Sequence, residues 1–328
     1  MNNIKNKQTN DYQPSLSVDL AIRKAQMLAD IRLFFAKKHV LEITTPILSH
    51  YGNTEVFIDS VRALFHQNGQ LKTGYLHTSP EFAMKRVLAD YQLPIYQICQ
   101  VFRDNEKGSK HNIEFTMLEW YRPHFTLEQL INELGELLTK VFHRPMPIKC
   151  YRYAQTFIDK LNIHPFLADI DTLKQCAIKH DIFVDMGDDK QSWLDLLFSH
   201  LIEPSLGFDL PTIILDYPPQ TASLAKIESD KDGHLVAKRF ELYIDGIEIA
   251  NAYDELSDGE ELLQRFENDN FKRQQLGLNT IPIDINLINC CRDLPPCSGI
   301  ALGIDRLFMV YGKLDNIQNA ITITTNHA

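Results

Sequence analysis

His111–Tyr121 reads HNIEFTMLEWY, and this stretch decides which fold and which site we expect in the 328-residue chain. Its second half alternates with the two-residue period of a β-strand. One face of that strand carries Phe115, Met117, Glu119 and Tyr121. A face that served only a hydrophobic core would not carry a carboxylate and a phenol beside an aromatic ring. The pattern therefore predicts a strand that holds a small molecule or an ion.

The segments around this strand predict helices interleaved with β-hairpins. Helical spacing and capping signals favour helices at about 20–40, 80–90 and 127–141, and a mostly helical stretch at 150–210. Strand signals favour a long hairpin over 95–122, a short strand at 212–216, a second hairpin over 240–253 and a strand followed by a helix at 298–311. This order predicts an α+β fold, an antiparallel β-sheet flanked by helices, rather than a doubly wound parallel sheet.

Composition and charge narrow the class of protein. The chain contains 44% hydrophobic and 23% charged residues, which is ordinary for a globular protein. The first dozen residues lack the apolar segment of a signal peptide, and no apolar run reaches the roughly 18 residues of a membrane span, so we expect a cytoplasmic protein. A net charge of -10 disfavours a broad surface for nucleic acids, although a local basic patch is compatible with it.

The six cysteines do not form a disulfide framework in a chain of this length. Three of them, Cys290, Cys291 and Cys297, are close enough in sequence to raise the question of a zinc site. Adjacent cysteines have poor geometry for one tetrahedral ion, and no histidine lies near them. We therefore expect free thiols.

The hairpin around Asp245-Gly246 brings two carboxylates onto one face of the sheet. A two-residue turn pairs Tyr243 with Glu248, which places Glu241 diagonally across from Glu248 at about 7–8 Å. Such a pair suits Mg²⁺, which proteins usually hold with one or two carboxylates plus phosphate oxygens. Two solvated glutamates on an exposed face would give the same pattern, so the hairpin alone leaves both interpretations open.

Two arginines are candidates for phosphate binding. Arg103 ends the first strand of the long hairpin, and Arg306 lies early in the C-terminal helix, after a strand that contains glycines. A guanidinium group matches phosphate with two parallel hydrogen bonds, and glycine lets a ligand approach the backbone closely. Each arginine taken alone is also compatible with an ordinary surface position.

In this order, the segments resemble the three signature motifs of the class II aminoacyl-tRNA synthetases. Motif 1 is similar to the first helix and LEITTP at 41–46, motif 2 to VFR at 101–103 through HNIEFTMLE at 111–119, and motif 3 to GIDR at 303–306. Within the family, TSPE at 78–81, HNIEFTMLEWY and EIANAYDE at 248–255 are most similar to the lysyl enzymes. The resemblance covers about residues 18–325.

The resemblance implies an enzyme that activates an amino acid with ATP and Mg²⁺. Arg103 is expected to bind the α-phosphate and the substrate carboxylate, Arg306 the γ-phosphate, and both are the expected catalytic residues. Phe115 is expected to stack on adenine, while Glu241 and Glu248 are expected to hold Mg²⁺. The other nucleotide-binding positions that the motifs imply are Asp104, Asn105, His111, Asn112, Ile249 and Gly303.

The resemblance also implies a pocket for a substrate with two amino groups. Its expected members are Ser79, Pro80, Glu81, Tyr121, Asn251, Tyr253, Glu255 and Ala301. Carboxylates are the physically expected partners of ammonium groups in a closed pocket. Because Glu248 and Asn251 have opposite parity on an ideal strand, this arrangement requires a bulge or a strong twist near Ala250.

The chain departs from the complete lysyl enzymes before motif 1. Fewer than 20 residues precede the first helix in this sequence, so we expect no anticodon-binding barrel. We expect 1–17 to be a flexible segment and 18–328 to be one catalytic domain. This truncation is similar to that of lysyl paralogues that attach (R)-β-lysine to a lysine side chain of elongation factor P. The expected acceptor is therefore elongation factor P rather than tRNA, and motif 1 implies a homodimer.

Three positions differ from the usual lysyl pattern. Ala301 replaces a glycine, and its methyl group is expected to favour an amino group on the β-carbon of the substrate. Asn105 replaces the motif 2 glutamate, a role that a small loop shift would have to transfer to Asp104. Tyr253 replaces a phenylalanine and adds a hydroxyl group that needs a partner.

Two alternatives stay open beside this function. One is a lysyl-synthetase-like enzyme or amide ligase that acts on another acceptor. The other is a non-catalytic, synthetase-like regulator, which is disfavoured because the expected phosphate and magnesium residues are all retained.

Overall fold

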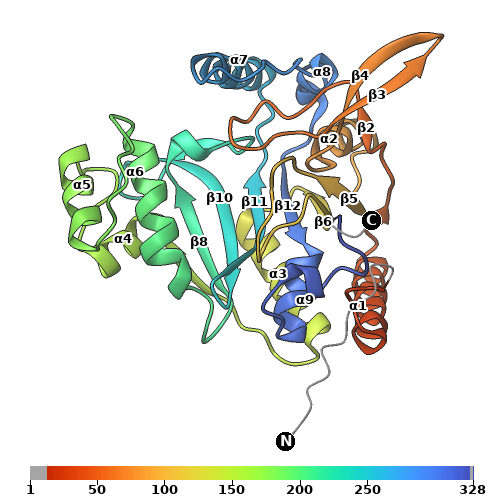
Figure 1. Ribbon diagram of the computed structural model, residues 1–328, viewed down its shortest axis with the longest axis horizontal. Helices are drawn as coiled ribbons and strands as arrows, with labels where there is room; N and C mark the ends of the chain where they lie inside the picture. The colour runs from red at the N-terminus through yellow and green to blue at the C-terminus, as the bar shows by residue number, and fades with distance from the viewer. Residues whose placement is uncertain (1–12, 326–327) are drawn as a thin grey trace, which may run out of the picture.

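The computed structural model describes residues 13–325 and residue 328, and a nine-stranded β-sheet forms its centre (Figure 1). The strand order is β1-β5-β6-β12-β11-β10-β8-β7, and β9 pairs with β10. These strands are β1 (Leu41–Glu42), β5 (Ile95–Phe102), β6 (Glu114–Pro123), β7 (Lys149–Arg152), β8 (Thr212–Tyr217), β9 (Ile227–Ser229), β10 (Leu235–Ile244), β11 (Ile247–Asp254) and β12 (Cys297–Gly303). The β1–β5 and β7–β8 pairs are parallel and the other described pairs of this sheet are antiparallel, which confirms the predicted sheet type.

Helices flank this sheet, and a small second sheet lies at one end of the molecule. The α-helices are α1 (Val18–Lys37), α2 (Glu81–Tyr91), α3 (Leu127–Phe142), α4 (Tyr153–Leu161), α5 (Ile170–Lys179), α6 (Lys190–Leu197), α7 (Gly259–Gln275), α8 (Ile285–Cys290) and α9 (Ile304–Gly312). The second sheet contains β2 (Leu48–Ser49), β3 (Arg62–Gln67) and β4 (Gln70–Leu76), and its β3–β4 hairpin projects from the body (Figure 1). The helices and hairpins predicted from the sequence are all present.

The alternation along β6 separates the core of the protein from a cavity. Leu118 and Trp120 lie on one face and belong to a large apolar cluster with residues of α1, α3 and α9. The ring centroids of Trp120 and Phe35 are 5.3 Å apart, and Trp120 Nε1 donates a hydrogen bond of 3.1 Å to Glu133. Truncating buried aromatic side chains of this kind costs about 3–5 kcal/mol. The opposite face of β6 lines the cavity, as the alternation in HNIEFTMLEWY predicted.

Side-chain caps fix where α1 and α3 begin. The Ser17 hydroxyl accepts a hydrogen bond of 3.4 Å from the backbone N–H of Leu20. Thr126 and Gln129 form the predicted capping box, in which each side chain accepts from the backbone N–H of the other, at 3.3 and 2.9 Å. Both helices therefore start at a polar residue that satisfies otherwise unpaired backbone groups.

The residues directly before α1 are part of the folded body. Leu16 is buried in the core, and the backbone N–H of Ser15 donates to the carbonyl of Thr322 at 2.8 Å. The predicted flexible segment therefore does not extend through Ser17. The rest of that segment, 1–12, lies outside the described residues.

The turn between β10 and β11 has the predicted two-residue geometry. Asp245 and Gly246 have positive φ angles of 51° and 67°, which a type I′ turn requires and which glycine and aspartate tolerate best. Tyr243 pairs with Glu248 across the hairpin, as predicted. The turn therefore sets the register of both strands.

A bulge in β11 changes that register within one residue. Leu242 pairs with Ala250, whereas the next residue of β10 pairs with Glu248, so Ile249 is an extra residue in β11. This is the bulge that the opposite parity of Glu248 and Asn251 predicted. Because of it, both side chains reach the same cavity.

The chain between β7 and β8 is mostly helical, as predicted, and forms a second apolar cluster. Residues of α4, α5 and α6 pack there against Tyr217 of β8 and Tyr243 of β10. This cluster fixes the position of the two tyrosines beside the cavity.

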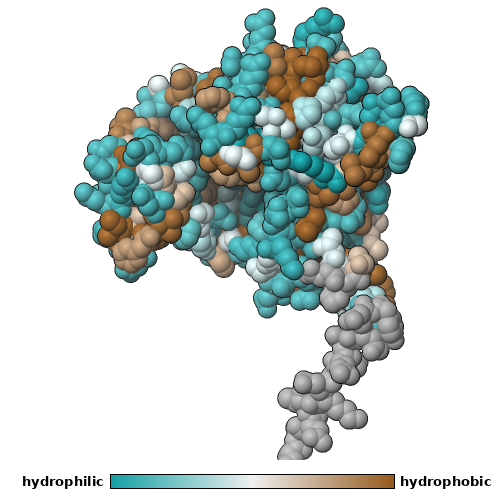
Figure 2. Space-filling model, turned by 45° about the horizontal axis from the view of Figure 1, so that its top comes forward, coloured by the Kyte–Doolittle hydropathy of each residue, from teal (hydrophilic) through white to brown (hydrophobic). Residues whose placement is uncertain are grey.

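The surface of the molecule mixes hydrophilic and hydrophobic side chains. On the face drawn in Figure 2, hydrophobic residues form separate patches among hydrophilic ones. The α1 side chains of Val18 and Ile22 are 74% and 65% exposed. None of the helices within 13–325 combines the length and apolarity that a bilayer crossing requires.

Candidate active site

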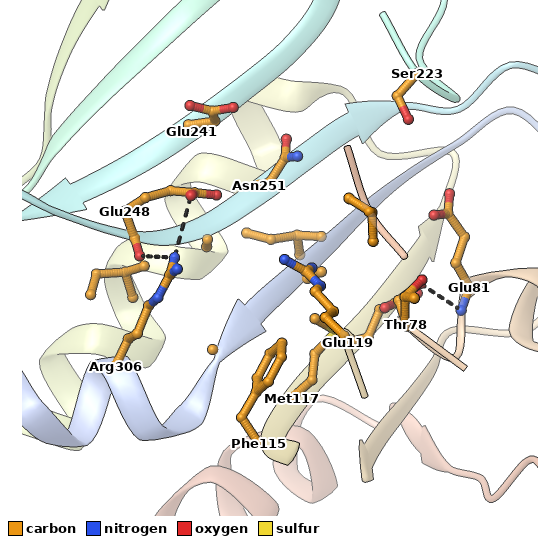
Figure 3. Close-up of a pocket in the computed structure, with 18 of the residues that line it drawn as sticks. Thr78, Glu81, Phe115, Met117, Glu119, Ser223, Glu241, Glu248, Asn251 and Arg306 are labelled. Atoms are coloured by element: carbon orange, nitrogen blue, oxygen red, sulfur yellow. Dashed lines mark hydrogen bonds and ion pairs between the residues drawn. The ribbon is translucent and has the colours of Figure 1, made fainter. Parts of the chain in front are cut away.

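A cavity of about 290 Å³ lies on the face of the sheet opposite the α1–α3–α9 core. Strands β6, β10, β11 and β12, helices α2 and α9, and the loops at 53–58 and 103–112 supply its walls. The predicted site residues that line it are Ser79, Glu81, Arg103, His111, Asn112, Phe115, Tyr121, Glu241, Glu248, Ile249, Asn251, Tyr253, Glu255, Ala301, Gly303 and Arg306. Figure 3 shows four of these side chains, Glu81, Phe115, Glu248 and Arg306, gathered around one space from four elements.

Three predicted site residues are not brought to the cavity. Pro80 is buried at the start of α2, and the Asp104 carboxylate accepts a hydrogen bond of 2.9 Å from the backbone of Asn105. Asn105 is exposed and has a positive φ of 61°. The next residue, Glu106, does line the cavity, and its Oε1 lies 3.6 Å from Arg103 Nη1. The carboxylate next to Arg103 therefore comes from position 106 and not from Asp104.

Strand register places one row of side chains across the cavity floor. Asn251 of β11 pairs with Ala301 of β12, and Ala301 pairs with Glu119 of β6. The Ala301 methyl group thus lies between an amide and a carboxylate. Asn251 Nδ2 donates a hydrogen bond of 2.9 Å to the Tyr253 hydroxyl, so the hydroxyl added at position 253 has a partner.

A second row explains the glycine in β12. Gly299 pairs with Tyr121 on one side and with Tyr253 on the other. A Cβ at Gly299 would lie 2.3 Å from Glu255 Oε1 and 2.4 Å from a ring carbon of Tyr121. Any side chain at this position would therefore push two substrate-pocket residues out of place.

One end of the cavity carries an excess of carboxylates. Lys85 is buried, with its Nζ 2.8 Å from Glu81 and 2.6 Å from Glu255. The Tyr121 hydroxyl donates a hydrogen bond of 2.6 Å to Glu119 Oε1, while Glu119 Oε2 is buried and has no hydrogen-bond partner among the described residues. Three carboxylates therefore face one ammonium group, an imbalance that a cationic ligand would offset.

The pKa values of these carboxylates show the same imbalance. Burial raises the pKa of Glu119 well above its ordinary value, and the nearby Glu81 carboxylate adds to the shift. Burial also raises the pKa of Glu255 to about 8, although Lys85 opposes this shift. An ammonium group bound here would stabilise the ionised forms.

The other end of the cavity is built around Arg306. Its Nη1 donates to the carbonyl oxygen of Glu248 at 3.0 Å and to the Glu248 carboxylate at 3.3 Å. Its Nη2 lies 2.7 Å from Nε2 of His111, a ring whose pKa is lowered by burial and by the Arg306 charge. His111 therefore accepts this hydrogen bond as a neutral imidazole. Nearby, the Arg103 guanidinium lies 5.3 Å from the Phe115 ring centroid.

Glu241 and Glu248 form a carboxylate pair beside Arg306. The hydroxyl of Tyr217 donates to Glu241 at 2.7 Å, and Tyr243 and Arg239 also hydrogen-bond to it. Burial raises the pKa of Glu241, and the Glu248 charge contributes to the shift. Within 13–325, no group of three or more His, Cys, Asp or Glu side chains is arranged to hold a metal. A pair of carboxylates fits Mg²⁺ that takes its remaining ligands from phosphate and water.

Comparison with known proteins assigns the chain to a family. The family described as tRNA synthetases class II (D, K and N) matches residues 9–326. The chain belongs to this family. Similar relatives include proteins named elongation factor P–(R)-β-lysine ligase from Salmonella typhi, 41% identical over 98% of this chain and 99% of the relative, and from Salmonella paratyphi B, 42% identical over the same shares. We therefore interpret this cavity as the candidate active site of a class II synthetase.

Several residues of the class II cavity were not predicted as site residues. They are Glu55, Lys85, Glu106, Glu119 and Arg239. Lys85 follows Glu81 by one helical turn in a helix that the sequence predicted, and Glu119 lies on the strand face that drew attention first. The sequence pattern could therefore have predicted that both side chains belong to the site. Glu55 and Glu106 lie in irregular loops, where no periodicity shows which way a side chain points.

The three clustered cysteines lie outside this cavity. The thiols of Cys290 and Cys291 both donate to the carbonyl oxygen of Leu287, at 3.2 and 3.3 Å, and Cys297 is buried. Burial raises the pKa of Cys290 to about 11, which keeps it protonated at neutral pH. These residues are free thiols in the structure, as expected from the sequence.

Glu203 is expected to make stability depend on pH. Burial and the charges of Glu248 and Glu241 raise its pKa from 4.5 to about 7. Between these values the folded state binds more protons than the unfolded state, so the free energy of unfolding falls as pH rises from about 4.5 to about 7. In urea unfolding at pH 5 and pH 7.5, Glu203→Gln should lose part of the decrease that the parent shows. Equal decreases in both proteins would contradict the assignment.

Proposed function

We propose that the chain activates (R)-β-lysine, or lysine, as an aminoacyl-adenylate and transfers it to a lysine ε-amine of elongation factor P. The chain is a ligase of the class II synthetase type, and its relatives carry the name elongation factor P–(R)-β-lysine ligase. One observation carries the proposal for the site: a single cavity has excess carboxylates at one end and two arginines with a carboxylate pair at the other. A diamino acid fits the first end, and a nucleoside triphosphate fits the second.

In the first step, the substrate carboxylate attacks the α-phosphorus of ATP and pyrophosphate leaves. Glu81, Glu119 and Glu255 would bind the two ammonium groups and hold the carboxylate toward Arg103. Arg103 would bind the α-phosphate and Arg306 the γ-phosphate, while Phe115 stacks on adenine. Catalysis then comes from positioning and charge compensation, since no protein nucleophile is needed.

Mg²⁺ would be held by Glu241 and Glu248, with phosphate oxygens as further ligands. When bound, it would neutralise phosphate charge at the scissile bond. Arg239 and the tyrosines at 217 and 243 keep the Glu241 carboxylate in one orientation. The Glu241 carboxylate is therefore already oriented when Mg²⁺ binds.

In the second step, the acceptor amine attacks the carbonyl carbon of the adenylate and AMP leaves. The proposal locates this reaction in the cytoplasm, where translation factors and ATP are found. We also propose that the reaction involves no tRNA. The net charge of -10 supports this, because binding of a nucleic acid backbone is driven by positive charge on the protein. We also propose a homodimer, since Val18 and Ile22 expose apolar surface on the motif 1 helix.

Glu119→Gln is expected to weaken amino-acid binding. The variant keeps the shape of the side chain but removes the charge that an ammonium group would pair with, a change worth about 1.5–3 kcal/mol. The KM for lysine or β-lysine in ATP–pyrophosphate exchange should rise roughly 10- to 100-fold. The KM for ATP should stay close to that of the parent. An unchanged KM for both amino acids would place the ammonium groups elsewhere.

Other acceptors are separated from elongation factor P by a direct experiment. The enzyme is incubated with ATP, β-lysine and, in turn, elongation factor P, tRNA or a free amine. Product on elongation factor P alone supports the proposal. Product on tRNA or on the free amine instead would support the lysyl-synthetase-like or amide-ligase alternative.

A further inference from the structure

The carboxylates that line the cavity have partners, with one exception in the part of the chain that the structure describes. Lys85 pairs with Glu81 and Glu255, Tyr121 with Glu119, Arg103 with Glu106, Arg239 with Glu241, Arg306 with Glu248, and Lys24 with Asp305. Glu55 also lines the cavity. Its backbone is hydrogen-bonded, but its carboxylate forms no hydrogen bond or ion pair with a described residue. The Glu55 carboxylate is therefore available to a ligand that enters the cavity.

The backbone around Glu55 is held in place by α7. The Thr54 hydroxyl donates a hydrogen bond of 3.0 Å to Asp269. Arg273, which is 3% exposed, donates to the carbonyl oxygen of Glu55 at 3.0 Å and to Asp59 at 2.8 Å. The backbone position from which the Glu55 side chain enters the cavity is therefore held by a buried arginine.

The charges around Glu55 come from four elements. Arg239 of β10 and Arg103 after β5 are positive, whereas Glu81 of α2 and Asp269 of α7 are negative. Burial raises the pKa of Glu55, the two carboxylates add to this shift, and the two arginines oppose it. Glu55 thus lines the same cavity as the arginine proposed for the α-phosphate and the carboxylate proposed for the amino acid. If Arg103 binds the α-phosphate and Glu81 the amino acid, the mixed anhydride of the adenylate lies in this same cavity.

The same loop also reaches the outer surface. Phe57, two residues beyond Glu55, is 85% exposed. Within three residues, this segment runs from the cavity to the solvent. It can therefore contact a lysine side chain that enters the cavity while the rest of its protein stays outside. The residues proposed for the amino acid and the nucleotide, by contrast, lie mainly on helices and strands of the cavity wall.

We propose that Glu55 binds the ammonium group of the acceptor lysine and accepts its proton in the transfer step. This inference rests on the proposed function, because it requires an adenylate and an amine acceptor. A lysine amine is protonated at neutral pH and becomes a nucleophile only after losing that proton. One proton passes from the ammonium group to Glu55, and the free amine attacks the carbonyl carbon. The new C–N bond forms, the C–O bond to AMP breaks, and the second nitrogen proton passes to the departing phosphate.

Glu55→Gln separates the two steps of the reaction. ATP–pyrophosphate exchange reports activation and should stay within about threefold of the parent, which also shows that the variant folds. Transfer from preformed adenylate to elongation factor P should fall by at least about 10²-fold in a single turnover. In the parent, the transfer rate should rise with pH as Glu55 ionises, and the variant should lack this rise. Glu55→Asp should recover part of the transfer rate.

Asp59→Asn is the matched control on the same loop. Its amide oxygen can still accept from Arg273, so both activation and transfer should match the parent. Two results would overturn the inference: a parent-like transfer rate in Glu55→Gln, or equal losses of exchange and transfer. If the parent itself showed no exchange with either amino acid, the proposed function would fail first, and the inference with it.

Discussion

Arg306→Ala is expected to lower the rate of ATP–pyrophosphate exchange by about 10²- to 10³-fold. The guanidinium group spans the cavity wall through hydrogen bonds to Glu248, His111 and Lys110. These bonds hold its positive charge in a fixed orientation, in which we propose that it meets the triphosphate, and alanine removes both the charge and the hydrogen bonds. Because the proposed role of this charge is to stabilise the leaving pyrophosphate, the loss should fall mainly on the catalytic rate.

The measurement is exchange of labelled pyrophosphate into ATP at saturating amino acid. Arg292→Ala is the matched control, because the Arg292 side chain is 82% exposed and lies outside the cavity. The control should exchange at the parent rate. An Arg306→Ala enzyme that also exchanges at the parent rate would remove Arg306 from the site.

Lys85→Met is expected to destabilise the fold by about 3–5 kcal/mol. Lys85 is the cation between two buried carboxylates, Glu81 and Glu255, and methionine fills its volume without its charge. Removing one member of a buried ion pair leaves the other members uncompensated, which costs more than the pair itself contributed. The free energy of unfolding in urea at pH 7.5 measures this loss.

Two comparisons make the Lys85 prediction specific. Lys149→Met breaks an exposed pair in which the Lys149 and Asp209 side chains are 44% and 91% exposed, and it should change stability by less than about 1 kcal/mol. Adding Glu255→Gln to Lys85→Met should recover part of the lost stability, because one buried charge disappears. A Lys85→Met protein as stable as the parent would show that the carboxylates are neutral in the empty cavity.

Local patterns were enough to predict most of the fold. The two-residue period of β6 predicted both its core face and its cavity face, and Asp245-Gly246 predicted the turn and register of the β10–β11 hairpin. The bulge at Ile249 was expected from the family resemblance, which assigned Glu248 and Asn251, two residues of opposite parity, to one cavity. For the two faces of β6 and for the turn, the information lay within a few residues along the chain.

The parts of the site that were missed depend on long-range contacts or on irregular loops. A helical lysine such as Lys85 ordinarily faces solvent, and its buried position follows from Glu255, which is distant in sequence. The positive φ of Asn105 turns the loop so that the next residue, Glu106, faces the cavity. The anchoring of Glu55 by Arg273 of α7 likewise joins segments far apart in the chain. Periodicity carries no information about such contacts.

We propose that this cavity activates a diamino acid and passes it to a protein amine. The most direct test is to incubate the enzyme with ATP, Mg²⁺, (R)-β-lysine or lysine, and purified elongation factor P, and then to measure the intact mass of the factor. We expect a gain of one lysyl unit that requires both ATP and the enzyme. An unchanged mass of elongation factor P with both amino acids, from an enzyme that performs ATP–pyrophosphate exchange, would contradict it.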